Sequence, residues 1–197
     1  MENDTESAAP AQLLFEMATG SGKTAVMASL ILDLYERGYR DYLFFVNKTQ
    51  IVEKTRANFI DSANSKFLFA QDVQIGDSRV ELRSVSNFDE ARSDAINIHF
   101  TTIQGLHARM LRPRENDMTP EDFEERRVVL ISDEAHHMSA ETRSVERLSS
   151  READARASWE GTVRQIMTHN QENILLEFTA TADLENSLIR EKYNDRL

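Results

Sequence analysis

A glycine-rich turn at residues 18–22 stands between two apolar segments near the start of this 197-residue chain. The segment before it, residues 12–16, is short and apolar like a buried strand. The segment after it, residues 23–37, repeats apolar residues at helical spacing. A strand, a glycine turn and a helix in this order restrict the fold strongly, because they are typical of the first unit of a parallel α/β sheet.

The rest of the chain continues this alternation of apolar strands and helices. Further strands are expected at 42–46, 95–100, 128–132 and 174–178, and further helices at 50–60, 102–111, 159–167 and 184–193. Strands joined by crossover helices form parallel sheets that are covered on both faces. The sequence therefore predicts a three-layer α/β domain with a mostly parallel central sheet and helices on both faces.

Three stretches carry weaker signals. Residues 66–85 fit a strand, a turn at Gly76-Asp77 and a second strand. Residues 112–125 are polar and predict a loop with a short helix after Thr119-Pro120. Residues 140–157 are highly charged and predict an exposed helical region.

Composition narrows the class of protein. The chain has no cysteine, which excludes disulfides and thiolate metal sites and favours the cytoplasm. No apolar run is long enough to span a membrane, and residues 1–10 have the composition of a loose polar tail rather than a signal peptide. The net charge of −11 argues against a protein that coats nucleic acid. This charge is compatible with a protein that binds a few phosphates through local hydrogen-bond donors.

The glycine turn has the chemistry of a phosphate-binding loop. Lys23 would reach the β- and γ-phosphates, and the Thr24 hydroxyl would bind Mg²⁺. The residues expected around the phosphates are Thr19, Gly20, Ser21, Gly22, Lys23 and Thr24. Met17 replaces the first glycine of the general pattern, and Gly20 partly compensates as a second flexible point. The alternative is an ordinary glycine turn before a helix, with Lys23 solvated.

An acidic pair follows the most apolar predicted strand, residues 128–132. Asp133 would hold Mg²⁺, and Glu134 would orient and deprotonate the attacking water. An acidic loop at a strand end is the simpler alternative. A zinc site at His136-His137 is disfavoured, because adjacent histidines do not easily face one metal and no cysteine is available. The conjunction of the acidic pair with the glycine loop favours nucleotide chemistry.

Five motifs together resemble superfamily 2 helicases. Asp133-Glu134-Ala135-His136 is similar to their DEAH box, and residues 18–24 to their motif I. Residues 45–55, 100–106 and 178–182 resemble motifs Ia, Ib and III in the same order. The resemblance is greatest to the helicase subunit (Res) of type III restriction enzymes. It is carried by the segments NKTQIVEKTRANF, FTTIQGLH, LISDEAHH and NILLEFTATAD. The resemblance covers residues 13–193.

The resemblance implies a RecA-like P-loop NTPase domain that uses ATP and Mg²⁺, with roles for further residues. His136 would link the nucleotide site to motif III, and Thr179 and Thr181 would couple hydrolysis to domain movement. The residues expected at the nucleic-acid backbone are Asn47, Lys48, Thr49, Thr101, Thr102 and Gln104. Short hydroxyl and amide side chains suit phosphate contacts. Thr49 and Thr102 also precede predicted helices, so an N-cap role is equally open for both.

The resemblance identifies residues 11–197 with ATP-binding domain 1. It also implies that this domain needs further partners. Motifs V and VI of a second RecA-like domain, with an arginine finger, are not found after residue 182, so that domain is expected as a partner in cis or in trans. DNA and a modification or specificity subunit are the other expected partners. Three hypotheses follow: the motor domain of a restriction-type DNA translocase, a nucleotide-binding module completed by a partner, and a kinase or GTPase. Motif III and the DEAH box argue against the third.

Overall fold

A seven-stranded sheet forms the centre of the protein in the computed structural model, which describes residues 10–70, 72–113, 115, 117–133 and 150–180, with backbone only for 150–157. The strand order is β1-β7-β6-β2-β5-β4-β3. The strands are β1 (Ala11–Glu16), β2 (Asp41–Val46), β3 (Val73–Ile75), β4 (Ser78–Ser84), β5 (Ala95–Thr102), β6 (Val128–Asp133) and β7 (Ile174–Thr179). All neighbouring strands are parallel except β3 and β4, which form an antiparallel hairpin.

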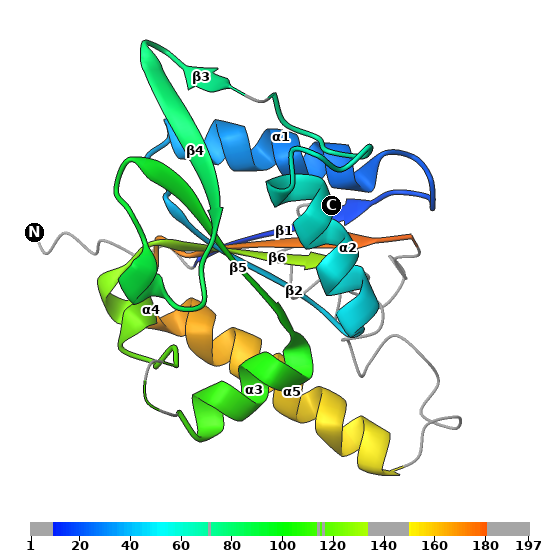
Figure 1. The fold of residues 1–197 in the computed structure, drawn as a ribbon. Coiled ribbons are helices and arrows are strands. Elements are labelled where there is room, and N and C mark those ends of the chain that lie inside the picture. Colours follow the sequence, from blue (N-terminus) through cyan, green and yellow to red (C-terminus); the bar gives the residue numbers. More distant parts are fainter. Residues whose placement is uncertain (1–9, 71, 114, 116, 134–149, 181–197) are drawn as a thin grey trace, which may run out of the picture.

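Helices cover both faces of this sheet (Figure 1). The helices are α1 (Lys23–Glu36), α2 (Thr49–Ile60), α3 (Ile103–Leu111), α4 (Asp122–Glu125) and α5 (Ser150–His169), with a 3-10 turn at Phe88–Glu90. Strand β2 shows why two layers of helix form. Its even-numbered residues, Tyr42, Phe44 and Val46, join a core with α1 and α2, whereas Leu43 and Phe45 join a second core with α3 and α5. Both faces of the strand are buried, and the predicted three-layer α/β architecture is confirmed.

Several local predictions are confirmed as well. The turn at Gly76-Asp77 joins β3 to β4, and Gly76 has the positive φ of 60° that such a turn requires. The short helix α4 follows Thr119-Pro120. The helix predicted at 159–167 is the second half of the longer α5, which begins inside the charged stretch. The predicted helix at 184–193 lies outside the described residues.

The carboxyl ends of five parallel strands meet at one edge of the sheet. Glu16 of β1 pairs with Thr179 of β7, whose Phe178 pairs with Asp133 of β6. On the other side of β6, Val46 of β2 pairs with Thr102 of β5. The ends of β1, β7, β6, β2 and β5 are therefore level, and the loops that follow them share one edge.

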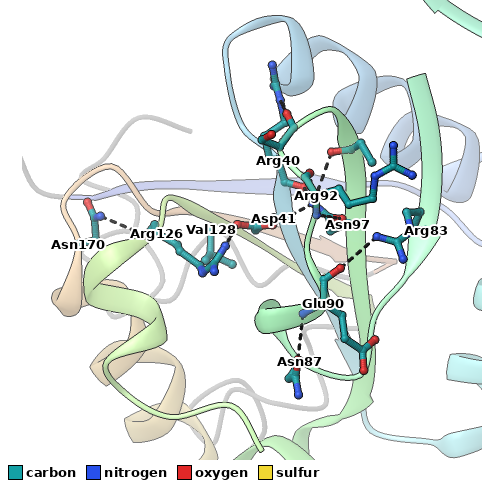
Figure 2. A network of polar contacts seen from close by, with 12 residues as sticks. Arg40, Asp41, Arg83, Asn87, Glu90, Arg92, Asn97, Arg126, Val128 and Asn170 are labelled. Atoms are coloured by element: carbon teal, nitrogen blue, oxygen red, sulfur yellow. Dashed lines mark hydrogen bonds and ion pairs between the residues drawn. The ribbon is translucent and has the colours of Figure 1, made fainter. Parts of the chain in front are cut away.

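The opposite edge is closed by a polar network, shown in Figure 2. Asp41, at the start of β2, is buried and accepts hydrogen bonds from Asn97 (3.1 Å) and Arg126 (3.3 Å). Burial raises the pKa of Asp41, and the nearby Arg126 guanidinium opposes that shift. Asn173 accepts a 2.8 Å bond from the Val128 amide. Each of these groups joins strand starts to one another, so this edge is structural.

Among the helices of the described segments, none is long and apolar enough to cross a membrane.

Candidate functional site

The predicted phosphate loop leaves β1 at the shared carboxyl edge. Its first residue, Met17, donates its backbone N–H to the Thr179 carbonyl at 2.8 Å, and Ser21 donates to the Ala18 carbonyl at 3.1 Å. Gly20 and Gly22 have φ values of 82° and 94°. Residues with a Cβ are strained there, so the loop takes this shape because glycine occupies both positions.

Helix α1 begins directly from this loop. Its N-cap is Gly22, which has no side chain to cap the first turn. Lys23 and Thr24 are half-buried at its start, whereas residues 18–22 are exposed. Among the described residues, a Cβ built on Gly20 or Gly22 meets nothing within 4 Å, so no described atom fills the space beside these two positions. A helix N-terminus with an adjacent lysine and no acidic residue in its first turn suits a polyphosphate. The residues present therefore fit the triphosphate of a nucleotide.

Asp133 ends β6 at the same edge and is half-buried. Only β7 separates β6 from β1 in the sheet. Two strand spacings amount to about 10 Å, which places the end of β6 within reach of a ligand bound on the loop. The structure thus brings Lys23, Thr24 and Asp133 to one side of the edge. Carboxylate and hydroxyl oxygens are suitable Mg²⁺ ligands. Glu134, His136 and Thr181 lie outside the described residues.

The other predicted residues gather beyond β6, after β2 and β5. The Gln104 side-chain amide at the start of α3 donates a hydrogen bond to the Asn47 Oδ1 atom, although 57 positions separate the two residues. Lys48 and Thr49 are exposed at the start of α2. This hydrogen bond therefore joins the two expected groups of polar side chains, one after each strand, at the carboxyl edge.

The N-cap role that the sequence left open is found for Thr102 and not for Thr49. The Thr102 hydroxyl caps α3 by accepting the Gly105 N–H at 3.1 Å, as predicted. The N-cap of α2 is Lys48, so the cap role is wrong for Thr49, which is already the first helical residue. Helix α2 therefore begins one residue earlier than the threonine pattern indicated. Thr101 is 8 % exposed, and its hydroxyl donates to the Thr102 carbonyl at 3.2 Å.

A buried histidine on β5 was not singled out by the sequence. His99 is 3 % exposed, with Nδ1 3.1 Å from the Val85 carbonyl and Nε2 3.1 Å from the Arg109 guanidinium. Arginine only donates, so Nε2 accepts and Nδ1 carries the proton. Burial, with a smaller contribution from the Arg109 charge, lowers the pKa of His99 to about 4. A single histidine within an apolar strand gives no sequence signal for this role.

A second interaction that the sequence did not predict joins helices α3 and α5. The His107 Nδ1 of α3 lies 2.6 Å from the Thr162 hydroxyl of α5, which itself donates to the Ser158 carbonyl at 3.1 Å. With that hydroxyl proton engaged, Nδ1 is the donor to Thr162. Helix α3, which carries Gln104, is therefore held by α5 through His107 and by the sheet through Arg109.

Comparison with known proteins identifies the family. The profile described as "Type III restriction enzyme, res subunit" matches residues 3–184. The chain belongs to this Res family. It is 41 % identical over 204 residues to the probable type III restriction-modification enzyme HindVIP Res subunit of Haemophilus influenzae. That alignment covers 95 % of this chain and 39 % of the relative, so the chain spans about two fifths of the curated Res protein that it matches.

A solved structure supports the fold of this Res-family domain. The UvsW helicase from bacteriophage T4 superposes with a TM-score of 0.52 at 12 % identity, covering 93 % of this chain and 51 % of the helicase. At this identity the likeness concerns the fold alone. Together with the family match it confirms the predicted RecA-like domain and the resemblance to superfamily 2 helicases of the Res type.

Proposed function

We propose that this Res-family chain is the ATP-binding motor domain of a DNA helicase or translocase in a type III restriction-like system. The observation that carries the proposal is the shared edge: the glycine loop after β1 and Asp133 at the end of β6 flank β7. In open α/β sheets, ligands bind beyond the carboxyl ends of the strands.

The nucleotide half of the edge has defined tasks. Backbone N–H groups of residues 19–24 would surround the phosphates, Lys23 would add a positive charge, and Thr24 with Asp133 would hold Mg²⁺, which would neutralise phosphate charge. Glu134 activates water in the same proposal. The open, exposed loop with its two positive-φ glycines supports this assignment.

The nucleic-acid half lies beyond β6. We assign backbone contacts to Asn47, Lys48, Thr49, Thr102 and Gln104. The contact predicted for Thr101 is not proposed, because that side chain is buried and its hydroxyl is bonded to the Thr102 carbonyl. The exposed Lys48 and the joined amides of Asn47 and Gln104 support this assignment, since such groups bond phosphate oxygens without reading bases. With a net charge of −11, binding through this edge is weak and depends on few contacts, so its salt dependence is shallow.

Strand β7 lies between the two parts of the nucleotide half. Its last residue, Thr179, is bonded through its carbonyl to the first residue of the phosphate loop. We assign Thr179, with Thr181 and His136, to coupling between hydrolysis and movement. The direct backbone link supports a coupling role for Thr179, because a shift of the strand end shifts the loop entrance.

The partners in this proposal are DNA, a second RecA-like domain in cis or in trans, and a modification subunit. The chain spans 39 % of the Res relative, and the name of that relative places it in a restriction-modification enzyme. An arginine from a second domain is worth orders of magnitude in rate in P-loop NTPases. We therefore expect this chain alone to bind Mg-ATP weakly and to hydrolyse it slowly. The Res-family match does not favour the alternative, a nucleotide-binding module that acts only with its partner domain.

The test measures binding of a fluorescent ATP analogue with Mg²⁺, and ATP turnover with and without DNA. Lys23→Ala removes the charge at the phosphates and should weaken binding by about tenfold or more, as expected for a hydrogen bond to a charged group. Lys54→Ala is the matched control, since Lys54 is exposed on α2. Equal binding by both variants would contradict the nucleotide site. Rapid DNA-stimulated turnover that Lys23→Ala or Glu134→Gln abolishes would show that the chain is self-sufficient.

A further inference from the structure

Gly105 lies in the first turn of α3 and has almost no room for a side chain. A Cβ at this position would lie 2.9 Å from the Thr101 Oγ1 atom and 3.2 Å from the Thr102 Oγ1 atom. The second helical glycine of the described chain, Gly161 of α5, differs in this respect. A Cβ there meets nothing within 4 Å. Two glycines in the same kind of backbone therefore have opposite surroundings.

The two hydroxyls beside Gly105 are fixed in place. Thr101 is buried and β-branched, and its hydroxyl is bonded to the Thr102 carbonyl. Such side chains have few alternative rotamers. The Thr102 hydroxyl is the cap itself, which accepts the Gly105 N–H at 3.1 Å. A methyl group at position 105 therefore has to move the first turn of α3 or to break its cap.

The rest of α3 is braced, so the helix does not follow such a shift as a whole. Arg109 is bonded to His99 of the sheet at 3.1 Å, and His107 to Thr162 of α5 at 2.6 Å. Displacement is then concentrated in the first turn. Gln104, the neighbour of Gly105, has its side chain bonded to Asn47 across the edge. Outside α3, the Asn47–Gln104 bond is therefore the contact that a change at Gly105 affects most directly.

We propose that Gly105 is a positioning residue that sets the Asn47–Gln104 amide pair for contact with a nucleic-acid backbone. Its missing side chain lets the Thr101 and Thr102 hydroxyls lie against the helix start, which holds Gln104 toward Asn47. The nucleic-acid part of this inference rests on the proposed function. The positioning part concerns the amide pair alone and is measurable without DNA.

The first experiment follows the side-chain amide resonances of Asn47 and Gln104 by NMR in the whole 22.6 kDa chain. In Gly105→Ala these resonances should move to the positions of solvated amides, whereas in Gly161→Ala they should stay unchanged. Far-UV circular dichroism and thermal melting confirm that both variants are folded. Unchanged amide resonances in folded Gly105→Ala would overturn the inference.

The second experiment removes the obstructing atom. Thr101→Ala deletes the hydroxyl nearest to the new methyl group, whereas Thr101→Val deletes the hydrogen bond but keeps the bulk. Gly105→Ala should therefore have little further effect on the amide resonances in the Thr101→Ala background and its full effect in the Thr101→Val background. Equal effects in the two backgrounds would show that steric contact with Thr101 is not the cause.

The third experiment measures affinity for a fluorescein-labelled DNA duplex and its single strand at low salt. Gly105→Ala, Asn47→Ala and Gln104→Ala should each weaken binding by about tenfold, as expected for loss of a bond to a phosphate. Gly161→Ala should bind like the parent chain. If Asn47→Ala and Gln104→Ala bind normally, or no DNA binding is found, the proposed DNA function of this edge fails. If these two variants are weakened and Gly105→Ala is not, the role of Gly105 fails.

Discussion

The Met17 backbone N–H donates a 2.8 Å hydrogen bond to the Thr179 carbonyl, which joins the entrance of the phosphate loop to the end of β7. The bond extends the parallel pairing of β1 and β7 past their last pair, Glu16 and Thr179. The loop conformation therefore depends on a strand that follows it by more than 150 positions in the sequence.

Phe178 is the side chain that most directly fastens β7 to β1. It is fully buried and stacks on Phe15, with ring centroids 4.7 Å apart. Phe178→Ala should lower the free energy of unfolding by about 3–5 kcal/mol, because it leaves a cavity in the core. Phe178→Leu keeps most of the apolar volume and should lose less. Urea denaturation measures both, and equal losses would contradict a packing role for the ring.

Gly22 and Gly161 should respond to alanine in opposite directions. Gly22 has a φ of 94°, so Gly22→Ala should destabilise the chain by about 1–2 kcal/mol through backbone strain alone. Gly161 lies in the interior of α5 with open space at its Cβ, and Gly161→Ala should stabilise the helix by up to about 1 kcal/mol. Thermal melting compares the two variants. A higher melting temperature for Gly22→Ala would contradict the loop conformation.

His99 should make stability depend on pH. Its pKa of about 4 in the folded protein lies below the ordinary value of 6.5, so the unfolded chain binds the proton more tightly. The neutral imidazole therefore stabilises the fold above pH 6.5, and that contribution is lost as pH falls from about 6.5 toward 4. The loss should reach about 3 kcal/mol, at 1.36 kcal/mol for each pKa unit. Urea midpoints across this range measure it.

The matching control for the histidine is His99→Gln. Glutamine offers an amide donor for the Val85 carbonyl and an oxygen acceptor for Arg109, but it does not titrate. The variant should lose the decline in stability between pH 6.5 and 4 while it keeps most of its stability at pH 8. A variant profile as steep as that of the parent chain would assign the decline to other groups.

Asp41 and Arg126 should behave as a coupled pair. Asp41 is only 6 % exposed, and Arg126→Met would leave its carboxylate without its main positive partner. This change should lower the free energy of unfolding by about 1–3 kcal/mol, and Asp41→Asn in the same chain should recover part of that loss. A double-mutant cycle by urea denaturation measures the coupling, and strict additivity would show that the pair does not interact.

The sign of the pH effect gives an independent check on the same pair. Burial already raises the pKa of Asp41, so its protonation favours the folded state. The stability difference between Arg126→Met and the parent chain should therefore shrink as pH falls through this raised pKa, since the neutral carboxyl group no longer needs a cation. A difference that stays constant or grows through this range would contradict the assignment.

Local signals in the sequence determined most of the element pattern. The glycines at 20, 22 and 76 fixed turns, because their positive φ values exclude ordinary residues. The alternation of apolar strands and amphipathic helices determined the three layers, and the residues of the motifs indicated the Res family by resemblance. Thr102 was a correct cap candidate because capping acts over three residues, 102 to 105. The cap role of Thr49 failed at a helix boundary, where one residue decides the outcome.

Only the tertiary structure decided which distant residues meet. The insertion of β7 between β1 and β6 links Thr179 to the phosphate loop, and it follows from sheet packing rather than from any local pattern. The Asn47–Gln104 bond, the protonation state of His99 and the crowding at Gly105 likewise depend on neighbours brought in by the fold. The sequence by itself thus determined the loop and the layers, because those depend on backbone preference and periodicity, and the residues of its motifs indicated the family by resemblance. The strand order and the side-chain contacts at the edge were decided in three dimensions, because they depend on packing between segments far apart in the chain.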